Sequence, residues 1–273
     1  MPFDDLGRPP LDAGALRKAL TGPGRLWTDI VITDQTVSTN ADVVAAARAS
    51  APEGTVHATD LQSAGRGRLD RTWTSPSGSG IAVSVLLRPD SIPAARWVWL
   101  PLLVGLAVDA TVRELGVECG LKWPNDVLVD DRKLAGILLE RIETPLGAAA
   151  IIGVGLNVTL REDELPVDTA TSLLLEGATE TDRTIVLRAL LRNLEALYRA
   201  WKEADGNPAA GIRDSYERRC VTIGSRVRVT LPTGSSPDGQ ALEGEATAID
   251  ELGRLVVDGQ AISAGDITHV RAV

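Results

Sequence analysis

The sequence predicts an α+β fold in two parts: a mixed β-sheet flanked by helices, followed by a small β-barrel. Three observations support this prediction. The chain has 273 residues, which at roughly 150 residues per domain allows one or two domains. Up to residue 219, helical and strand patterns alternate along the chain. From Val221 onward, short β-runs are separated by glycine-containing turns, a pattern typical of a barrel of about 50 residues.

Helices and strands alternate through the first 219 residues. Ser38, Thr39 and Asn40 are capping residue types that mark a helix start, and Pro101 lies in the first turns of another helix, where proline is tolerated. The expected helices cover 11–20, 41–49, 96–115, 184–205 and 208–219. The expected strands cover 27–36, 55–59, 81–87, 127–129, 133–141 and 148–158.

The spacing of apolar residues predicts a long helix, and the segments after Val221 are predicted as strands. Leu187, Leu190, Leu194 and Trp201 recur at helical spacing within 184–205. The strands expected after Val221 cover 226–231, 244–250, 254–258 and 267–270, with 232–240 as a long hairpin tip. This part of the chain is therefore expected to be all-β.

Composition excludes disordered and membrane-spanning chains. Hydrophobic residues make up 44% and charged residues 24% of the chain, as in ordinary globular proteins. The longest apolar stretches, 97–108 and 145–156, are shorter than the roughly 20 residues that a membrane-spanning helix needs. The N-terminus has no basic start and no apolar run, so it is not a signal peptide. We expect a cytoplasmic protein without a membrane partner.

Charge and metal-ligand content exclude two further classes. The net charge of −9 argues against the phosphate-neutralising surface of a nucleic-acid-binding protein. Two isolated cysteines, Cys119 and Cys220, and two histidines, His57 and His269, do not suit a zinc site or a disulfide framework. Any metal is expected to be a hard cation held by oxygens and arriving with phosphate.

The first chemically informative segment runs from Gln62 to Arg71 and interleaves glycines with arginines. Arginine offers fixed charged donors that match phosphate and carboxylate oxygens, and glycine allows close backbone approach. The segment suits a site that holds two anions, and it equally suits a solvated arginine loop or an RGG-like nucleic-acid segment. It is not a P-loop, because the GxxxxGK[ST] pattern is absent.

Three further segments carry polar groups on short strands or turns. Residues 122–126 read Lys-Trp-Pro-Asn-Asp, 133–138 read Lys-Leu-Ala-Gly-Ile-Leu, and 153–157 read Gly-Val-Gly-Leu-Asn. Taken singly, each has an ordinary structural interpretation: an Asn-Asp turn, an exposed lysine at a strand end, and a close-packed strand. Only their combination indicates chemistry.

That combination closely resembles the catalytic domain of the biotin–protein ligases. The order and intervals of Ser38-Thr39-Asn40 and of segments 65–68, 122–126, 133–138 and 153–157 carry the resemblance. It covers residues 28–273 and includes the C-terminal barrel. It implies a class II synthetase-like biotin–lipoate ligase fold with an SH3-like barrel. The expected division is an N-terminal segment over 1–24, a catalytic domain over 25–219 and the barrel over 220–273.

The resemblance implies a two-step ligase reaction. Biotin is activated with ATP to biotinyl-5′-AMP, and a lysine on the biotin carboxyl carrier domain of an acyl-CoA carboxylase then accepts the biotinyl group. Mg²⁺ is expected to bind through the phosphates, with no metal site built from protein side chains. A mobile 64–71 loop is expected to order over the adenylate and shield it from water.

The resemblance also implies roles for individual residues. Lys133 and Arg68 match positions that touch the reacting carboxylate and phosphate, and they are the expected catalytic residues. The positions expected to bind biotin are Ser38, Thr39, Asn40, Gln62, Gly65, Arg66, Trp123, Lys133, Gly136, Leu138 and Gly153. The positions expected to bind the nucleotide are Arg66, Arg68, Arg71, Trp73, Asn125, Asp126, Lys133 and Asn157.

Two features depart from the family pattern, and two alternatives stay open. Asp70 replaces the second glycine of Gly-Arg-Gly-Arg-x-Gly-Arg, which leaves the role of Arg71 uncertain, and the 232–240 hairpin is long. The 37 residues before Ser38 are fewer than the about 60 that a winged DNA-binding module needs, so the monofunctional form is expected. A lipoate–protein ligase and a non-catalytic binding module are the alternatives.

Overall fold

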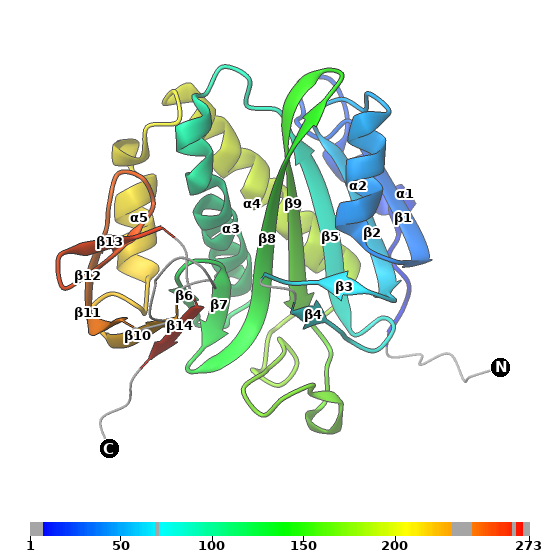
Figure 1. Cartoon of the computed structure of the whole chain (residues 1–273). Coiled ribbons are helices and arrows are strands. Elements are labelled where there is room, and N and C mark those ends of the chain that lie inside the picture. The colour runs from blue at the N-terminus through cyan, green and yellow to red at the C-terminus, as the bar shows by residue number, and fades with distance from the viewer. Residues whose placement is uncertain (1–7, 69–70, 231–241, 264–265, 270–273) are drawn as a thin grey trace.

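A seven-stranded mixed sheet lies at the centre of the fold (Figure 1). The computed structural model describes residues 8–68, 71–230, 242–263 and 266–269. Across the sheet, the strands are β1 (Asp29–Thr36), β2 (Thr55–Gln62), β5 (Gly80–Leu87), β9 (Gly147–Asn157), β8 (Arg132–Thr144), β7 (Asp126–Val129) and β6 (Gly120–Lys122). Strands β1 and β2 pair in parallel, and all other neighbours are antiparallel. The predicted α+β class with a mixed sheet is confirmed.

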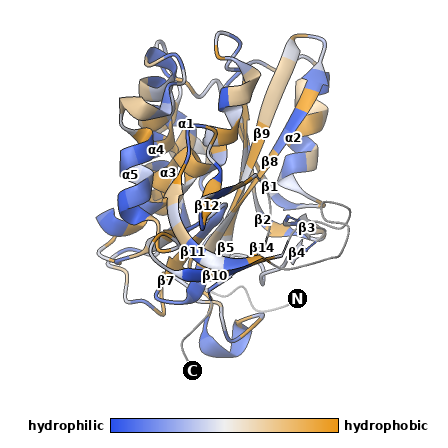
Figure 2. Ribbon diagram, turned by 60° about the vertical axis from the view of Figure 1, so that its left-hand side comes forward, coloured by the Kyte–Doolittle hydropathy of each residue, from blue (hydrophilic) through white to orange (hydrophobic). Residues whose placement is uncertain are grey.

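Helices cover one face of this sheet fully and the other only in part. The helices are α1 (Ala13–Leu20), α2 (Thr39–Arg48), α3 (Leu100–Glu114), α4 (Arg183–Glu203) and α5 (Ile212–Arg219), with short 3-10 turns η1 (Ala94–Trp99), η2 (Glu162–Glu164) and η3 (Pro208–Ala210). Helices α3 and α4 pack on one face, and α1 packs on β1 and α4. Figure 2 shows apolar residues concentrated on α3 and the central strands.

Helix α2 covers only the upper half of the opposite face. Its Val43 and Ala47 pack on Leu86 of β5 and Ile151 of β9 in a small separate cluster. Further along the same strands and on the same face, the pattern changes to Ser84 paired with Gly153. The short hairpin of β3 (Gly65–Arg66) and β4 (Thr72–Trp73) lies across this half instead of a helix (Figure 1).

The predicted helix over 96–115 begins as the 3-10 turn η1 and becomes α-helical at Leu100, with Pro101 as its second residue. By length and composition alone, Ala94–Glu114 could cross a membrane, yet 72% of its most apolar window is buried inside the fold. It is therefore the core helix that the sequence predicted.

A second, five-stranded antiparallel sheet forms the C-terminal part. Its strands, in sheet order, are β13 (Gln260–Ile262), β12 (Leu255–Val257), β11 (Leu242–Ile249), β10 (Arg226–Thr230) and β14 (Asp266–His269). Two buried indoles of the first part donate hydrogen bonds to one loop of this sheet: Trp99 Nε1 to the Glu251 carbonyl at 2.9 Å and Trp123 Nε1 to the Gly253 carbonyl at 2.9 Å. The hairpin predicted over 232–240 lies outside the described residues.

Candidate active site

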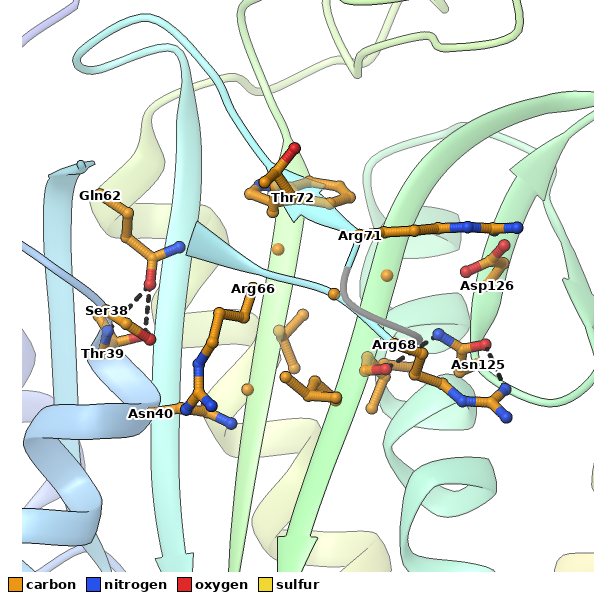
Figure 3. Close-up of a pocket in the computed structure, with 18 of the residues that line it drawn as sticks. Ser38, Thr39, Asn40, Gln62, Arg66, Arg68, Arg71, Thr72, Asn125 and Asp126 are labelled. Carbon is orange, nitrogen blue, oxygen red and sulfur yellow. Dashed lines mark hydrogen bonds between the residues drawn. The ribbon is translucent and has the colours of Figure 1, made fainter. Parts of the chain in front are cut away.

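A pocket opens on the half of the sheet that α2 leaves uncovered (Figure 3). Its floor is formed by β8 and β9, one wall by the start of α2, and its roof by the β3–β4 hairpin. The lining residues are Ser38, Thr39, Asn40, Gln62, Arg66, Gly67, Arg68, Arg71, Thr72, Trp73, Asn125, Asp126, Lys133, Gly136, Ile137, Leu138, Gly153, Val154 and Gly155. The pocket thus gathers side chains from segments far apart in the sequence.

Glycines on the floor make room for side chains that lie over the sheet. Gly136 pairs with Gly155, and Leu138 pairs with Gly153. A Cβ added to Gly155 would lie 2.4 Å from Cε2 of the Trp73 ring, and one added to Gly153 would lie 2.3 Å from Asn40 Oδ1. The glycine spacing in 153–157 therefore creates space at both ends of the pocket.

The first turn of α2 supplies the polar end of the pocket. Ser38 occupies the N-cap position without a side-chain capping hydrogen bond, and its hydroxyl lines the pocket instead. Thr39 N donates to Gln62 Oε1 at 2.9 Å, which turns the Gln62 amide nitrogen toward the cavity (Figure 3). This end therefore offers both a donor and hydroxyl oxygens to a ligand.

Lys133 reaches the pocket because of a β-bulge at the start of β8. The register between β7 and β8 shifts after the pair of Val127 with Ala135, so that Leu128 pairs with Lys133 and Leu134 is the extra residue. Strict alternation would place Lys133 on the face opposite Gly136. The bulge brings both to the pocket face, where Lys133 Nζ lies 2.6 Å from Asp126 Oδ1 and 5.7 Å from the centroid of the Trp73 ring.

The loop that follows β9 holds the backbone of Lys133 on its other side. Lys133 N donates to the Thr169 carbonyl at 2.6 Å, and Thr171 N donates to the Lys133 carbonyl at 3.0 Å. The strand residue at the mouth of the pocket is therefore fixed by two elements, β7 and this loop.

The arginine-rich segment forms the β3–β4 hairpin over the pocket. Gly65 pairs with Trp73 and Arg66 with Thr72. Arg68 Nη1 donates to Asn125 Oδ1 at 3.1 Å, and the Arg71 side chain extends toward Asp126 (Figure 3). Three arginines thus line one cavity, Arg66 beside Asn40 and the other two near Asn125 and Asp126 (Figure 3), and they supply the fixed cations that a site for two anions requires.

Comparisons with known proteins identify the family. Residues 33–157 match the biotin/lipoate A/B protein ligase family, and residues 222–270 match the biotin protein ligase C terminal domain. A biotin–[acetyl-CoA-carboxylase] ligase of Mycobacterium tuberculosis is 44% identical over 273 residues, which cover 97% of each chain. The chain belongs to the biotin protein ligase family. The predicted family is therefore confirmed.

Two further relatives of this ligase illustrate the range of the family. The bifunctional ligase/repressor BirA of Bacillus spizizenii is 34% identical over 90% of this chain and 72% of its own length. A biotin protein ligase from Aquifex aeolicus, solved in complex with biotin and ATP, has a TM-score of 0.73 at 26% identity and covers 90% of this chain and 100% of its own.

Most residues predicted for the site of this ligase lie together in the pocket. Those that line it are Ser38, Thr39, Asn40, Gln62, Arg66, Arg68, Arg71, Trp73, Asn125, Asp126, Lys133, Gly136, Leu138 and Gly153. Three predicted residues do not line it: Gly65, Trp123 and Asn157. The departure predicted at Asp70 lies outside the described residues.

Trp123 and Asn157 are placed differently because other parts of the ligase bind their polar groups. Trp123 is 2% exposed, and its indole nitrogen bonds to Gly253 in the C-terminal sheet. Asn157 Nδ2 donates to the Thr171 carbonyl at 2.8 Å and so supports the loop that holds Lys133. Gly65 belongs to the hairpin itself and is buried, and a Cβ added there would lie 2.3 Å from the Trp73 carbonyl oxygen and 2.8 Å from Gln62 Nε2.

Sequence reasoning missed several residues of the ligase pocket. Gly67, Thr72, Ile137, Val154 and Gly155 also line it, and Glu140 accepts hydrogen bonds from two lining side chains. A strand period of two could have found Glu140, since Gly136, Leu138 and residue 140 share one face of β8.

The described part of the ligase contains no cluster of three or more His, Cys, Asp or Glu side chains that could hold a metal. Both cysteines are free. Burial is the main cause that raises the pKa of the Cys119 thiol and that of the Cys220 thiol. A raised pKa disfavours the thiolate, the form of cysteine that acts as a nucleophile.

Proposed function

We propose that this pocket activates biotin with ATP and transfers it to a lysine of a carboxyl carrier domain of an acyl-CoA carboxylase. The observation that supports this proposal most strongly is the order of surfaces along one pocket. A polar end at the start of α2, with Arg66 beside Asn40, is followed by a glycine floor with Leu138 and then by Lys133, Arg68 and Arg71 near Asn125 and Asp126 (Figure 3). This order matches a ureido ring, an apolar chain and a carboxylate meeting a phosphate.

The polar end is proposed to bind the ureido ring. A ureido group has one carbonyl acceptor and two N–H donors, so it needs both kinds of partner. Gln62 Nε2 provides a donor, and the hydroxyl oxygens of Ser38 and Thr39 provide acceptors. The thiophane ring and the valeryl chain then lie against Leu138 and the floor strands between Gly136 and Gly153, where apolar surface is removed from water.

The opposite end is proposed to bind ATP. The Trp73 ring lies over Gly136 and Gly155 and offers an aromatic face for adenine. Arg68 and Arg71 supply charged donors for the phosphates at this end, Arg66 reaches the cavity from the side of Asn40 and Glu140, and Asn125 holds Arg68 in place. Mg²⁺ is proposed to arrive bound to the phosphates; Asp126 is the one carboxylate among the described lining residues, and it is already paired with Lys133.

Lys133 and Arg68 are proposed to promote the first step. A biotin carboxylate oxygen attacks the α-phosphorus of ATP, the bond to pyrophosphate breaks, and biotinyl-5′-AMP forms. Two anions must approach each other, so fixed cations stabilise the crowded phosphorus centre more than the separated reactants. In the second step the neutral amine of the carrier lysine attacks the biotinyl carbonyl carbon, AMP leaves, and the amine loses a proton as the amide forms.

We further propose that residues 25–219 form the catalytic part and 220–273 the barrel, in a protein that acts in the cytoplasm. All lining residues fall between Ser38 and Gly155, which supports this division. The segment 1–24 is not independent of the catalytic part, because Leu16 and Leu20 of α1 are buried in the same core as Ile30 of β1.

Formation of the adenylate by the purified protein tests the proposed function. Protein incubated with biotin, ATP and Mg²⁺ should retain biotinyl-5′-AMP, detected by mass spectrometry. ATP–pyrophosphate exchange should depend on biotin and not on lipoate. Exchange driven by lipoate would favour a lipoate ligase, and absence of any adenylate would favour a non-catalytic binding module.

A further inference from the structure

We propose that Glu140 is a positioning residue that fixes the direction of the hydrogen bonds at the ureido end of the pocket. This inference rests on the proposed binding of biotin. Glu140 belongs to none of the motifs that identify the family. It lies on β8 two residues beyond Leu138, and its Oε1 accepts from Asn40 Nδ2 at 2.8 Å and from Arg66 Nη2 at 2.8 Å.

A carboxylate settles the orientation of the Asn40 amide. The oxygen and nitrogen of an amide can exchange places unless the partners decide between them. The Glu140 carboxylate, which forms an ion pair with Arg66, can accept hydrogen bonds but cannot donate them. The Nδ2 group of Asn40 must therefore face it. Asn40 Oδ1 then faces the hydroxyl of Ser84, which donates to it at 2.6 Å.

This orientation passes to Thr39 through Ser84. The Ser84 and Thr39 hydroxyl oxygens lie 2.7 Å apart, and either could be the donor by geometry alone. Because the single proton of Ser84 is directed to Asn40, only Thr39 can supply the proton between them. Every donor in the chain Thr39, Ser84, Asn40 therefore points toward Glu140.

The consequence for a ligand is that the Thr39 oxygen acts as an acceptor. The Thr39 hydroxyl also lies 3.2 Å from Gln62 Oε1, but the 2.7 Å contact with Ser84 is shorter and has no other proton, so the Thr39 proton is directed to Ser84 and a lone pair is available to an N–H group in the pocket. Thr39 is 3%, Asn40 4% and Ser84 0% exposed, so water does not replace any of these bonds. Gln62 Nε2 beside it is a donor. The Thr39 acceptor and the Gln62 donor together match a ring that carries an N–H group next to a carbonyl. If the hydrogen bonds from Thr39 through Ser84 to Asn40 ran in the opposite direction, the Thr39 hydroxyl would place a donor against that N–H group.

Steady-state kinetics of a Glu140→Met variant test this assignment. Methionine keeps the approximate length but removes the acceptor, so Asn40 can turn over and Thr39 can become a donor. An opposed donor pair in a buried site should raise the KM for biotin by about tenfold or more. The KM for ATP should rise much less. The KM for desthiobiotin should rise as much as that for biotin, since both carry the same ureido group.

Exchanging the amide at position 40 with the carboxylate at position 140 distinguishes an effect of hydrogen-bond direction from a general loss of structure. Asn40→Asp alone places two acceptor-only groups face to face and should weaken biotin binding. Adding Glu140→Gln restores a donor–acceptor pair between positions 140 and 40 with the same net charge as the parent, and Ser84 can still donate to the carboxylate now at position 40. The amide oxygen at position 140 is then the acceptor left for Arg66, which in the parent shares Glu140 Oε1 with Asn40. The exchanged double variant should therefore recover a biotin KM close to that of the parent. Recovery does not depend on whether Glu140→Met folds.

Glu143→Gln is the matched control, because Glu143 lies on the same strand, pairs with Arg141 and is 69% exposed. It should change neither KM. The assignment is overturned if Glu140→Met, folded by its melting temperature, binds biotin like the parent, or if the exchanged pair is as defective as Asn40→Asp. If the parent itself forms no biotinyl-5′-AMP, the proposed function fails instead.

Discussion

Lys133 is the cation that we propose to contact both reacting anions. Replacing it with alanine should reduce biotinyl-5′-AMP formation several hundredfold, since loss of a fixed group that stabilises transition-state charge costs about 3–4 kcal/mol. The fold should persist, because the Lys133 side chain is 35% exposed and ends beside Asp126 at the pocket. Quenched-reaction mass spectrometry measures the adenylate, and thermal melting checks the fold.

Lys122→Ala is the comparison for Lys133→Ala. Lys122 lies on β6 at the sheet edge and does not line the pocket, so its loss should affect adenylate formation far less. If folded Lys133→Ala forms adenylate within about threefold of the parent rate, well short of the loss expected for an electrostatic stabiliser, the catalytic role of Lys133 is wrong.

Substitutions at Gly153 and Gly155 on the pocket floor should affect different substrates. The Cβ of Gly155→Ala would meet the Trp73 ring, and that of Gly153→Ala would meet Asn40 Oδ1. Such overpacking typically costs about 1–3 kcal/mol, so roughly tenfold changes in KM are expected. Gly155→Ala should mainly raise the KM for ATP, and Gly153→Ala that for biotin. Equal effects of both variants on both substrates would contradict the proposed placement of the ligands.

At the scale of elements, the positions of helices and strands could be predicted, whereas the face of the sheet on which the first side chains of β8 lie could not. Alternation and capping residues located α2, β8 and β9 because burial of an apolar face imposes a period on the sequence. The bulge at Leu134 leaves no such mark, since Leu134 and Ala135 are both apolar and both buried. The predicted strand start at Lys133 was close to correct, but the face of Lys133 came from the resemblance and not from periodicity.

The β3–β4 hairpin should become more ordered when the pocket is filled. In the described residues, two residue pairs join its strands, and its arginines have phosphates to bind only when ATP is present. Peptides covering 64–73 should gain hydrogen-exchange protection with biotin and ATP together. A peptide over 221–230, in the C-terminal part, should not change. Equal protection of the hairpin with and without ligands would show that it is preformed.

The contact between the N-terminal segment and the η2 turn should respond to acid. The hydrogen bond from Arg8 lowers the pKa of Glu164, outweighing burial, which raises it. A lowered folded-state pKa stabilises the fold above the ordinary Glu value of about 4.3, and this stabilisation is lost as the pH falls through the lower folded value. Glu164→Gln should therefore reduce the melting temperature at neutral pH, and the difference should disappear only as the pH falls below the lowered folded-state pKa of Glu164.

Asp163→Asn, at an exposed neighbouring position, serves as the control for Glu164→Gln. Its melting temperature should stay close to that of the parent across the same pH range. A Glu164→Gln difference that is constant with pH would show that the Arg8 contact does not depend on the charge of Glu164.

At the scale of the whole molecule, the parts of the site that escaped sequence reasoning depend on contacts between distant segments. The motif around Trp123 fixes a turn, yet its buried indole N–H needs an acceptor, and Gly253 of the C-terminal sheet supplies it. Asn157 likewise meets a carbonyl of the loop after β9. Neither partner is marked by local spacing. The motifs that line the pocket from within one strand, such as Gly136 with Leu138, were predictable because their geometry is local.

The whole chain is also poor in groups that could capture its own intermediate. It contains four lysines, Lys18, Lys122, Lys133 and Lys202, against 24 arginines. A mixed anhydride acylates neutral amines, whereas arginine stays protonated and does not act as a nucleophile. Lys18 on α1 is the one lysine classed as exposed, and Lys202 is paired with Glu53 at 3.3 Å. We therefore expect transfer to a lysine on another protein.

Biotinylation in the presence and absence of a carrier domain tests this directionality. With biotin and ATP alone, self-labelling should be substoichiometric and confined to Lys18, so that Lys18→Arg removes it. Added carrier domain should be modified at one lysine by the parent. Stoichiometric self-biotinylation of the parent at one lysine, with the carrier left unmodified, would overturn transfer to a separate protein.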